Sequence, residues 1–167
     1  MSAQVFLITG AASGIGRHLS GAILRRGHRL LATDIDEDGL RAARAGWPGS
    51  DGNVRLQRLD IRDPAAWAAA TARCVAELGG LDVLLNVAGY LHPGYAVDQP
   101  ATEVDRHFDI NAKGVVHGTT AAAAVMRQRG GGHIINFGSL AGVAPVPGNA
   151  LYSASKFAVR GFSLATA

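Results

Sequence analysis

Short apolar runs bounded by turn-forming residues alternate along the chain with longer segments in which apolar residues recur at helical spacing. The apolar runs predict β-strands at residues 4–9, 29–34, 54–59, 81–86 and 133–137. The longer segments predict helices at residues 14–26, 37–45, 64–78, 102–111 leading into 114–129, and from 150 to the end.

The strand runs are apolar throughout and do not alternate strictly, which is typical of a parallel sheet covered on both faces. Strands that alternate with helices predict right-handed βαβ crossovers, and therefore a Rossmann-like, doubly wound parallel sheet with three α/β/α layers. Since a domain has roughly 100–200 residues, we expect residues 1–167 to form a single domain. Ligands of such sheets lie outside the carboxyl ends of the strands, so candidate site residues should follow strands.

Composition and charge narrow the class of protein. A hydrophobic content of 48% with 17% charged residues excludes a disordered chain. The net charge of +3 comes from scattered arginines, and the pair Arg25-Arg26 is interpreted as a solvated helix end in preference to a nucleic-acid patch. We therefore expect no nucleic-acid partner.

The single cysteine, Cys74, cannot form an internal disulfide, which favours a reducing compartment. It is expected to be a small buried residue. No run approaches the ~18 apolar residues of a membrane span, and the start of the chain has no signal-peptide pattern. These features predict a cytoplasmic protein without a membrane partner.

A glycine-rich turn, Thr9-Gly10-Ala11-Ala12-Ser13-Gly14-Ile15-Gly16, joins the first predicted strand to the first helix. Glycines permit a tight turn and close approach of a pyrophosphate to the backbone. The helix N-terminus offers N–H groups and about half a positive charge to phosphates. The position of the turn therefore predicts dinucleotide binding, and the residues expected to take part are Gly10, Ser13, Gly14, Ile15 and Gly16.

Asp34 ends the second predicted strand. A carboxylate there can accept hydrogen bonds from the hydroxyls of an adenosine ribose and would repel a 2′-phosphate. The residues that follow, Ile35-Asp36-Glu37-Asp38, add negative charge and no arginine. NAD(H) is therefore favoured over NADP(H) as the cofactor. The alternative is that Asp34 merely begins a loop.

Later segments carry residue types suited to catalysis. Ser139 follows the fifth predicted strand, and Tyr152-Ser153-Ala154-Ser155-Lys156 lies further along the chain. With the glycine-rich turn and the motif Asn86-Val87-Ala88-Gly89, the whole chain resembles the short-chain dehydrogenase/reductase family in its single-domain form. Val87 stands where that family has a second asparagine.

The resemblance implies roles for individual residues. The catalytic group would be Ser139, Tyr152, Lys156 and Asn111, with Asn111 holding a water that links Lys156 to solvent. Asp60 would lie near the adenine, and Lys156 would hold the nicotinamide ribose. The further residues implied to bind the cofactor are Asp60, Ile61, Asn86, Ala88, Gly89, Tyr152 and Lys156.

Tyr152 and Lys156 are four residues apart and would share one face of a helix. A free phenol titrates near pH 10, so only nearby positive charge makes it a useful base at neutral pH. Tyr152 would remove the hydroxyl proton of a secondary alcohol and would protonate a ketone in the reverse direction. Ser139 would hydrogen-bond the same oxygen. The alternative is that Tyr152 is a half-buried helix residue, Lys156 a surface charge and Ser139 a turn former. The joint occurrence of the three residues disfavours this alternative.

The segment between Ser139 and Tyr152 is expected to line the substrate pocket, and its mostly aliphatic side chains mildly favour an apolar alcohol or ketone. The residues in question are Leu140, Val143, Pro145, Val146 and Asn149. The 6 histidines show no metal-ligand spacing, so no metal is expected. His92 is interpreted as a loop residue in preference to a substrate contact.

Small residues are frequent in the helices at 114–129 and 150–167. By resemblance these helices would pack against their copies, which predicts a homodimer or homotetramer. Because the family's members are usually longer, we expect the natural chain to continue past Ala167 with further strands. Without them the fifth strand would be an apolar sheet edge. The alternative to an active enzyme is a catalytically inactive or truncated dinucleotide-binding module.

Overall fold

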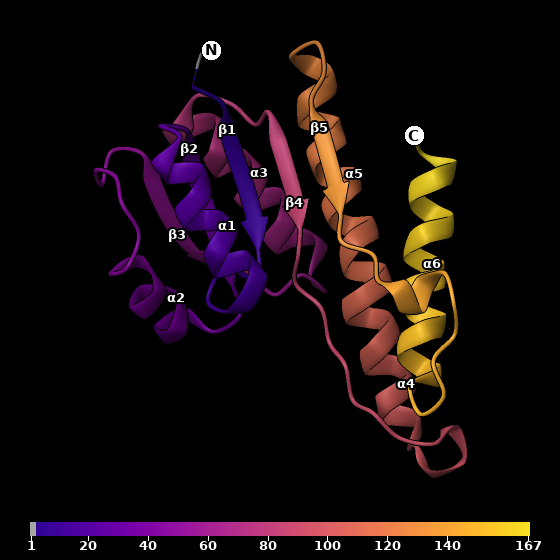
Figure 1. Ribbon diagram of the computed structural model, residues 1–167. Helices are drawn as coiled ribbons and strands as arrows, with labels where there is room; N and C mark the ends of the chain where they lie inside the picture. The colour runs from indigo at the N-terminus through magenta and orange to yellow at the C-terminus, as the bar shows by residue number, and fades with distance from the viewer. Residues whose placement is uncertain (1–2) are drawn as a thin grey trace.

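A parallel five-stranded sheet runs through the middle of the molecule (Figure 1), and the computed structural model describes residues 3–167. The strand order is β3-β2-β1-β4-β5, so the chain reverses its direction of travel across the sheet between β3 and β4. The strands are β1 (Val5–Thr9), β2 (Arg29–Asp34), β3 (Val54–Arg58), β4 (Val83–Asn86) and β5 (His133–Asn136). This arrangement confirms the Rossmann-like α/β fold expected from the sequence.

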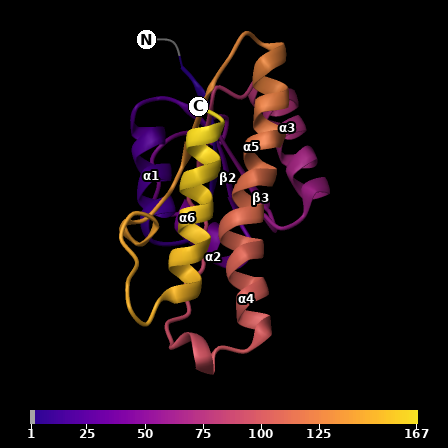
Figure 2. The same ribbon diagram turned by 90° about the vertical axis from the view of Figure 1, so that its right-hand side faces the viewer.

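Helices cover both faces of the sheet. The helices that pack on the strands are α1 (Gly14–Arg25), α2 (Glu37–Arg44), α3 (Pro64–Leu78) and α5 (Gly114–Gln128). Two further helices, α4 (Ala101–His107) and α6 (Ala150–Ala165), contact each other and lie side by side (Figure 2). Among residues 3–167, no helix is long and apolar enough to cross a bilayer.

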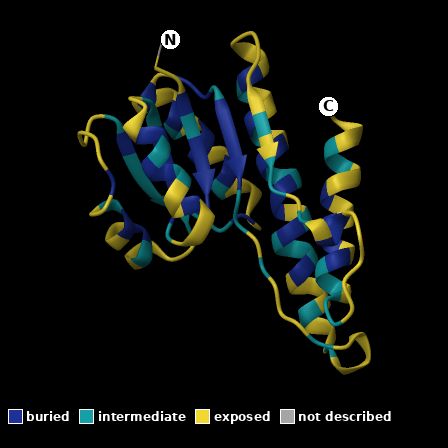
Figure 3. Cartoon of the chain, viewed as in Figure 1, coloured by how far each residue is buried: buried dark blue, intermediate teal, exposed yellow. Residues whose placement is uncertain are grey.

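Two hydrophobic cores form because successive strand residues point to opposite faces. Leu7 belongs to the core beneath α3 and α5, while its neighbour Ile8 belongs to the core beneath α1 and α2. The same division separates Leu84 from Leu85 on β4. Burial is most complete in the central strands (Figure 3), as expected when both faces are covered.

The single cysteine lies in the core beneath α3, as predicted. Cys74 is fully buried, and burial raises the pKa of its thiol to about 12. β5, by contrast, lies at the edge of the sheet, and Ile135 on its outer face is half exposed.

The predicted helix at 102–111 differs from the structure in one respect. α4 ends at His107 and continues as a π-helical turn, η2 (Phe108–Lys113), before α5 begins. The extra residue of a π-helical turn cannot be read from 3.6-residue periodicity, because such turns are rare and are set by tertiary contacts. Several other predicted boundaries move by one or two residues; β4, for example, begins at Val83 and not at residue 81.

Candidate active site

A cavity of about 470 Å³ opens at the carboxyl ends of β1, β2 and β4, where the strand order changes direction. This is the position at which open parallel sheets bind ligands. Most of the residues expected to contact a dinucleotide line it together. They are Gly10, Ser13, Gly14, Ile15, Gly16, Asp34, Asp60, Ile61, Ala88 and Gly89.

The glycine-rich turn is as tight as its sequence predicts. Gly10 has a φ of 70°, and a Cβ added there would lie 3.0 Å from the Cα of Ala88. A Cβ on Gly16 would overlap the carbonyl oxygen of Gly10. Ser13 is the N-cap of α1 and makes no side-chain capping bond, so the first N–H groups of α1 remain free for an anion.

Thr9 fastens the turn to the segment after β4, a role that the sequence did not indicate. Its Oγ1 accepts hydrogen bonds of 3.0 Å from the backbone N–H groups of both Val87 and Ala88. Val87 therefore takes part in the site through its backbone N–H, while its side chain packs against the core beneath α1 and α2.

Asp34 both lines the cavity and holds its wall. Its Oδ2 accepts the N–H of Ala12 at 2.9 Å, and its Oδ1 accepts the N–H of Asp36 at 3.0 Å. Each oxygen retains a second lone pair. Asp34 thus organises the start of a loop and also lines the cavity, and its binding of ribose hydroxyls stays a prediction.

Asp60 and Arg62 form an ion pair at the edge of the cavity, and sequence reasoning missed the arginine. Arg62 Nη2 lies 2.6 Å from Asp60 Oδ2, and Arg62 Nε lies 2.9 Å from Asp60 Oδ1. These hydrogen bonds from the guanidinium lower the pKa of Asp60, against the opposing effect of burial. The only signal in the sequence was the placement of an arginine two residues after the aspartate.

Another wall of the cavity is built by Tyr90 and Arg106, which sequence reasoning also missed. The Arg106 guanidinium carbon lies 4.1 Å from the centroid of the Tyr90 ring. The Tyr90 hydroxyl donates a hydrogen bond of 2.8 Å to Glu103. His107 is fully buried beside them, with its Nδ1 2.7 Å from the Glu103 carbonyl oxygen and its Nε2 accepting the N–H of His92. His92 is therefore a loop residue whose backbone is anchored.

Asn111 lies in η2 and is fully buried. Its Oδ1 accepts the N–H of Tyr90 at 2.7 Å, and its Nδ2 donates to the Tyr90 carbonyl oxygen at 2.8 Å and to Ser155 Oγ at 3.0 Å. The side-chain amide is thus engaged with protein atoms, which ties the segment after β4 to α6. Its role in holding a water stays a prediction.

Tyr152 and Lys156 project from the same side of α6, and the Lys156 Nζ lies 5.8 Å from the centroid of the Tyr152 ring. The Lys156 Nζ donates a hydrogen bond of 2.8 Å to the Phe137 carbonyl oxygen. Only 4% of Lys156 is exposed, and burial lowers the pKa of its ammonium. It is therefore not a surface charge.

Ser139 is brought to this helix by a short turn, η3 (Leu140–Gly142), that packs on α6. A Cβ on Gly142 would lie 2.7 Å from the Lys156 carbonyl oxygen, so the two backbones are in close contact. The Ser139 Oγ accepts the N–H of Ala141 at 3.1 Å. Its O–H hydrogen remains available to another acceptor.

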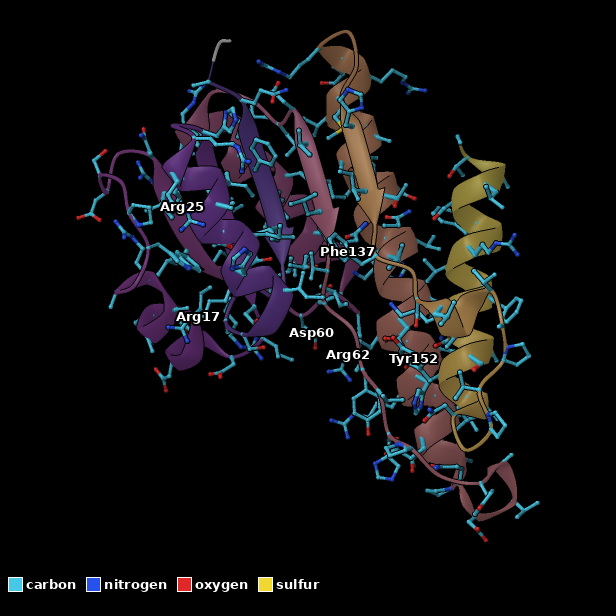
Figure 4. All side chains as sticks on the ribbon, viewed as in Figure 1. Arg17, Arg25, Asp60, Arg62, Phe137 and Tyr152 are labelled. Atoms are coloured by element: carbon cyan, nitrogen blue, oxygen red, sulfur yellow. The ribbon has the colours of Figure 1, made fainter. Side chains whose placement is uncertain are left out.

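The catalytic candidates and the cavity meet at Gly89. A Cβ built on Gly89 would lie 3.3 Å from Asn111 Oδ1 and 3.7 Å from Lys156 Nζ, and Gly89 itself lines the cavity. Figure 4 shows Tyr152 on α6, with Asp60 and Arg62 near the ends of the central strands. Tyr152 and Lys156 are not among the cavity-lining residues.

Asn86 is not among the residues that line the cavity. Its Nδ2 donates a hydrogen bond of 2.9 Å to Asn136 Oδ1, because β4 and β5 pair these two residues in register. A cofactor contact by Asn86 stays a prediction.

The segment that precedes α6 faces the loop that follows β4. Gly94 donates its N–H to the Gly148 carbonyl oxygen at 2.8 Å and forms an isolated parallel bridge with Asn149. Leu140 and Val143, earlier in the segment between Ser139 and Tyr152, are 77% and 60% exposed. Within residues 3–167, no group of three or more His, Cys, Asp or Glu side chains could hold a metal ion.

Comparison with known proteins identifies relatives along the whole chain. It is 35% identical over 167 residues to 2,5-dichloro-2,5-cyclohexadiene-1,4-diol dehydrogenase LinX of Sphingobium indicum, covering 67% of that protein. It is 38% identical over 165 residues to 3-alpha-(or 20-beta)-hydroxysteroid dehydrogenase of Mycobacterium bovis, covering 98% of this chain and 62% of the relative. The chain thus spans roughly two thirds of the length of these relatives.

Solved structures agree with this relationship. A short chain dehydrogenase/reductase from Burkholderia phymatum in complex with NAD superposes with a TM-score of 0.91 at 29% identity, covering 99% of this chain and 59% of that one. NAD+-bound xylitol dehydrogenase gives a TM-score of 0.91 at 28% identity, with 98% and 64% covered. A family model described as short chain dehydrogenase matches residues 4–167. The chain belongs to the short-chain dehydrogenase family.

Proposed function

We propose that the protein is an NAD(H)-dependent oxidoreductase that interconverts a secondary alcohol and a ketone. The observation that carries the proposal is the meeting of two groups at Gly89: the cavity with its glycine-rich turn, and the buried Lys156 beside Tyr152. The printed names of the relatives, a diol dehydrogenase and a hydroxysteroid dehydrogenase, agree with alcohol chemistry.

The cavity fits a dinucleotide. Side chains on Gly10 and Gly16 would fill the space next to the turn, and the free N–H groups at the start of α1 suit a pyrophosphate. Asp34 would bind the adenosine ribose hydroxyls and repel a 2′-phosphate, which supports NAD(H) over NADP(H). When bound, NAD+ would supply the hydride acceptor.

The protein's own residues would handle the proton. Tyr152 Oη removes the hydroxyl proton of the alcohol and returns a proton to the carbonyl oxygen in the reverse direction. The Lys156 ammonium would stabilise the negative charge that develops on Tyr152 Oη during proton transfer, because opposite charges attract strongly in a site of low polarity. Ser139 Oγ donates a hydrogen bond to the same substrate oxygen and fixes its position.

Binding and turnover test the proposal separately. Calorimetry with NAD+ and with NADP+ should give the tighter binding for NAD+. A panel of secondary alcohols should then give NADH absorbance that Tyr152→Phe abolishes. Binding without turnover, unaltered by Tyr152→Phe, would instead support a catalytically inactive or truncated dinucleotide-binding module. The observation that favours this second candidate is that Tyr152 and Lys156 are not among the residues that line the cavity.

We further propose that residues 1–167 act as one domain in the cytoplasm, where the single buried thiol of Cys74 would stay reduced. The proposed assembly is a homodimer or homotetramer formed through α5 and α6. Phe157 and Leu164 on α6 are partly exposed apolar side chains that such an interface would cover. A monomeric mass in light scattering at micromolar concentration would contradict the proposed assembly.

A further inference from the structure

Asp60 and Arg62 form an ion pair that is held by several short hydrogen bonds. Arg62 directs both its side chain and its backbone at one carboxylate: its N–H and its Nε lie 3.0 and 2.9 Å from Asp60 Oδ1. Its Nη2 and its Nε lie 2.6 and 3.2 Å from Oδ2. Both residues line the cavity, and both are labelled in Figure 4. The planar guanidinium therefore fixes the orientation of the carboxylate as well as its charge.

The Asp60 carboxylate has one hydrogen-bond acceptor position that Arg62 does not occupy. An ionised carboxylate accepts about four hydrogen bonds. Oδ1 is used by two close donors, whereas Oδ2 has one close donor and a share of the Nε hydrogen. One acceptor position on Oδ2 is thus free, and its direction is set by the hydrogen bonds that Arg62 makes to the carboxylate. An aspartate is ionised at neutral pH and Arg62 lowers the pKa of Asp60 further, so this position is an acceptor and not a donor.

We infer that Arg62 is a positioning residue that makes the cavity select a dinucleotide base with an exocyclic amino group, acting through Asp60. Adenine carries such an amino group, whereas hypoxanthine presents a carbonyl oxygen at the same ring position. An acceptor-only carboxylate attracts the first and repels the second. The inference rests on the proposed dinucleotide function and adds to it the residue that fixes base selectivity.

The test compares NAD+ with nicotinamide hypoxanthine dinucleotide by calorimetry on the purified protein. A hydrogen bond to a charged group corresponds to about tenfold or more in affinity, so the wild type should favour NAD+ by at least about that factor. Arg62→Gln should reduce this preference to about threefold or less. Arg62→Lys, which keeps the charge without the planar guanidinium, should give an intermediate value.

Two further variants separate positioning from a general loss of structure. Arg73→Gln breaks an arginine–glutamate pair whose Nε lies 2.7 Å from Glu77 outside the cavity, and it should leave the preference unchanged. Asp60→Asn should lose the preference as Arg62→Gln does. Because Arg62 acts through Asp60, the double variant should lose no more than either single one. Thermal unfolding of each variant checks that it is folded.

The outcomes separate this inference from the proposed function. A wild type that binds neither dinucleotide overturns the proposed function and the inference together. A wild type that binds both, with a preference that Arg62→Gln leaves unchanged, overturns the inference alone. Additive losses in the double variant also overturn it, since they mean that Arg62 contacts the base independently of Asp60.

Discussion

The buried amide of Asn111 donates a hydrogen bond of 3.0 Å to Ser155 Oγ, which in turn donates one of 2.8 Å to the Tyr152 carbonyl oxygen. The same amide holds the backbone of Tyr90 at the cavity wall. One asparagine thus fixes the relative position of the cavity wall and α6. The π-helical turn that carries it supplies the local geometry.

Ser155→Ala should separate positioning from cofactor binding. The substitution breaks the connection from Asn111 to α6 and leaves the bonds to Tyr90 in place. Small displacements of a catalytic group can reduce turnover by about a hundredfold; for one lost hydrogen bond we expect kcat to fall about tenfold while the Kd for NAD+ stays within about twofold. Steady-state kinetics and calorimetry measure the two quantities. A Kd that weakens as much as kcat falls would contradict the assigned role.

Gly16→Ala should abolish dinucleotide binding. The new Cβ would overlap the Gly10 carbonyl oxygen, so the turn or α1 has to move. Overpacking of this kind costs about 1–3 kcal/mol of stability. Gly52→Ala is the matched control, because its nearest neighbour would be Ser50 Oγ at 3.6 Å. Thermal unfolding and calorimetry should show a large effect at residue 16 and almost none at residue 52.

Asp34→Asn should weaken the preference for NAD+ over NADP+. The amide keeps one oxygen acceptor for the loop and removes the charge that repels a 2′-phosphate. We expect the ratio of the two affinities to fall by about tenfold or more. Asp38→Asn is the control, since it removes the same charge from a side chain that is 95% exposed on α2. If both variants change the ratio equally, the effect is one of net charge.

Cys74 should react with thiol reagents only when the protein opens. With a pKa of about 12, roughly one thiol in ten thousand is ionised at pH 8, and the sulfur is fully buried. The reactive species is the thiolate, and the thiol of the unfolded chain ionises at a lower pH than the buried thiol of the native protein. As the pH is raised, the unfolded chain should therefore become labelled before the native protein does. Labelling followed by mass spectrometry should therefore track unfolding. Rapid labelling of the native protein would contradict the burial.

The sequence predicted what depends on local pattern. Uninterrupted apolar runs located the strands, and the glycines between β1 and α1 located the cavity, because Gly10 and Gly16 have backbone requirements that few other residues meet. The burial of Lys156 disagrees with the alternative that it is a surface charge, while its catalytic role stays a prediction.

Contacts between distant segments could not be predicted in this way. Asn86 turns toward Asn136 because β4 and β5 are neighbours in register, and register across a sheet is not encoded in either strand alone. The stacking of Arg106 on Tyr90 depends on how α4 packs beside the segment after β4. Arg62 escaped notice because an arginine near an aspartate is usual on any protein surface.

Tyr152→Phe tests the central claim most directly, by NADH formation with a secondary alcohol measured beside NAD+ binding. The variant removes only the phenolic oxygen, so we predict that turnover falls by about a thousandfold or more while NAD+ affinity is unchanged. Tyr95→Phe, at a tyrosine that is 73% exposed, should retain wild-type turnover. Turnover that survives in Tyr152→Phe would contradict the account.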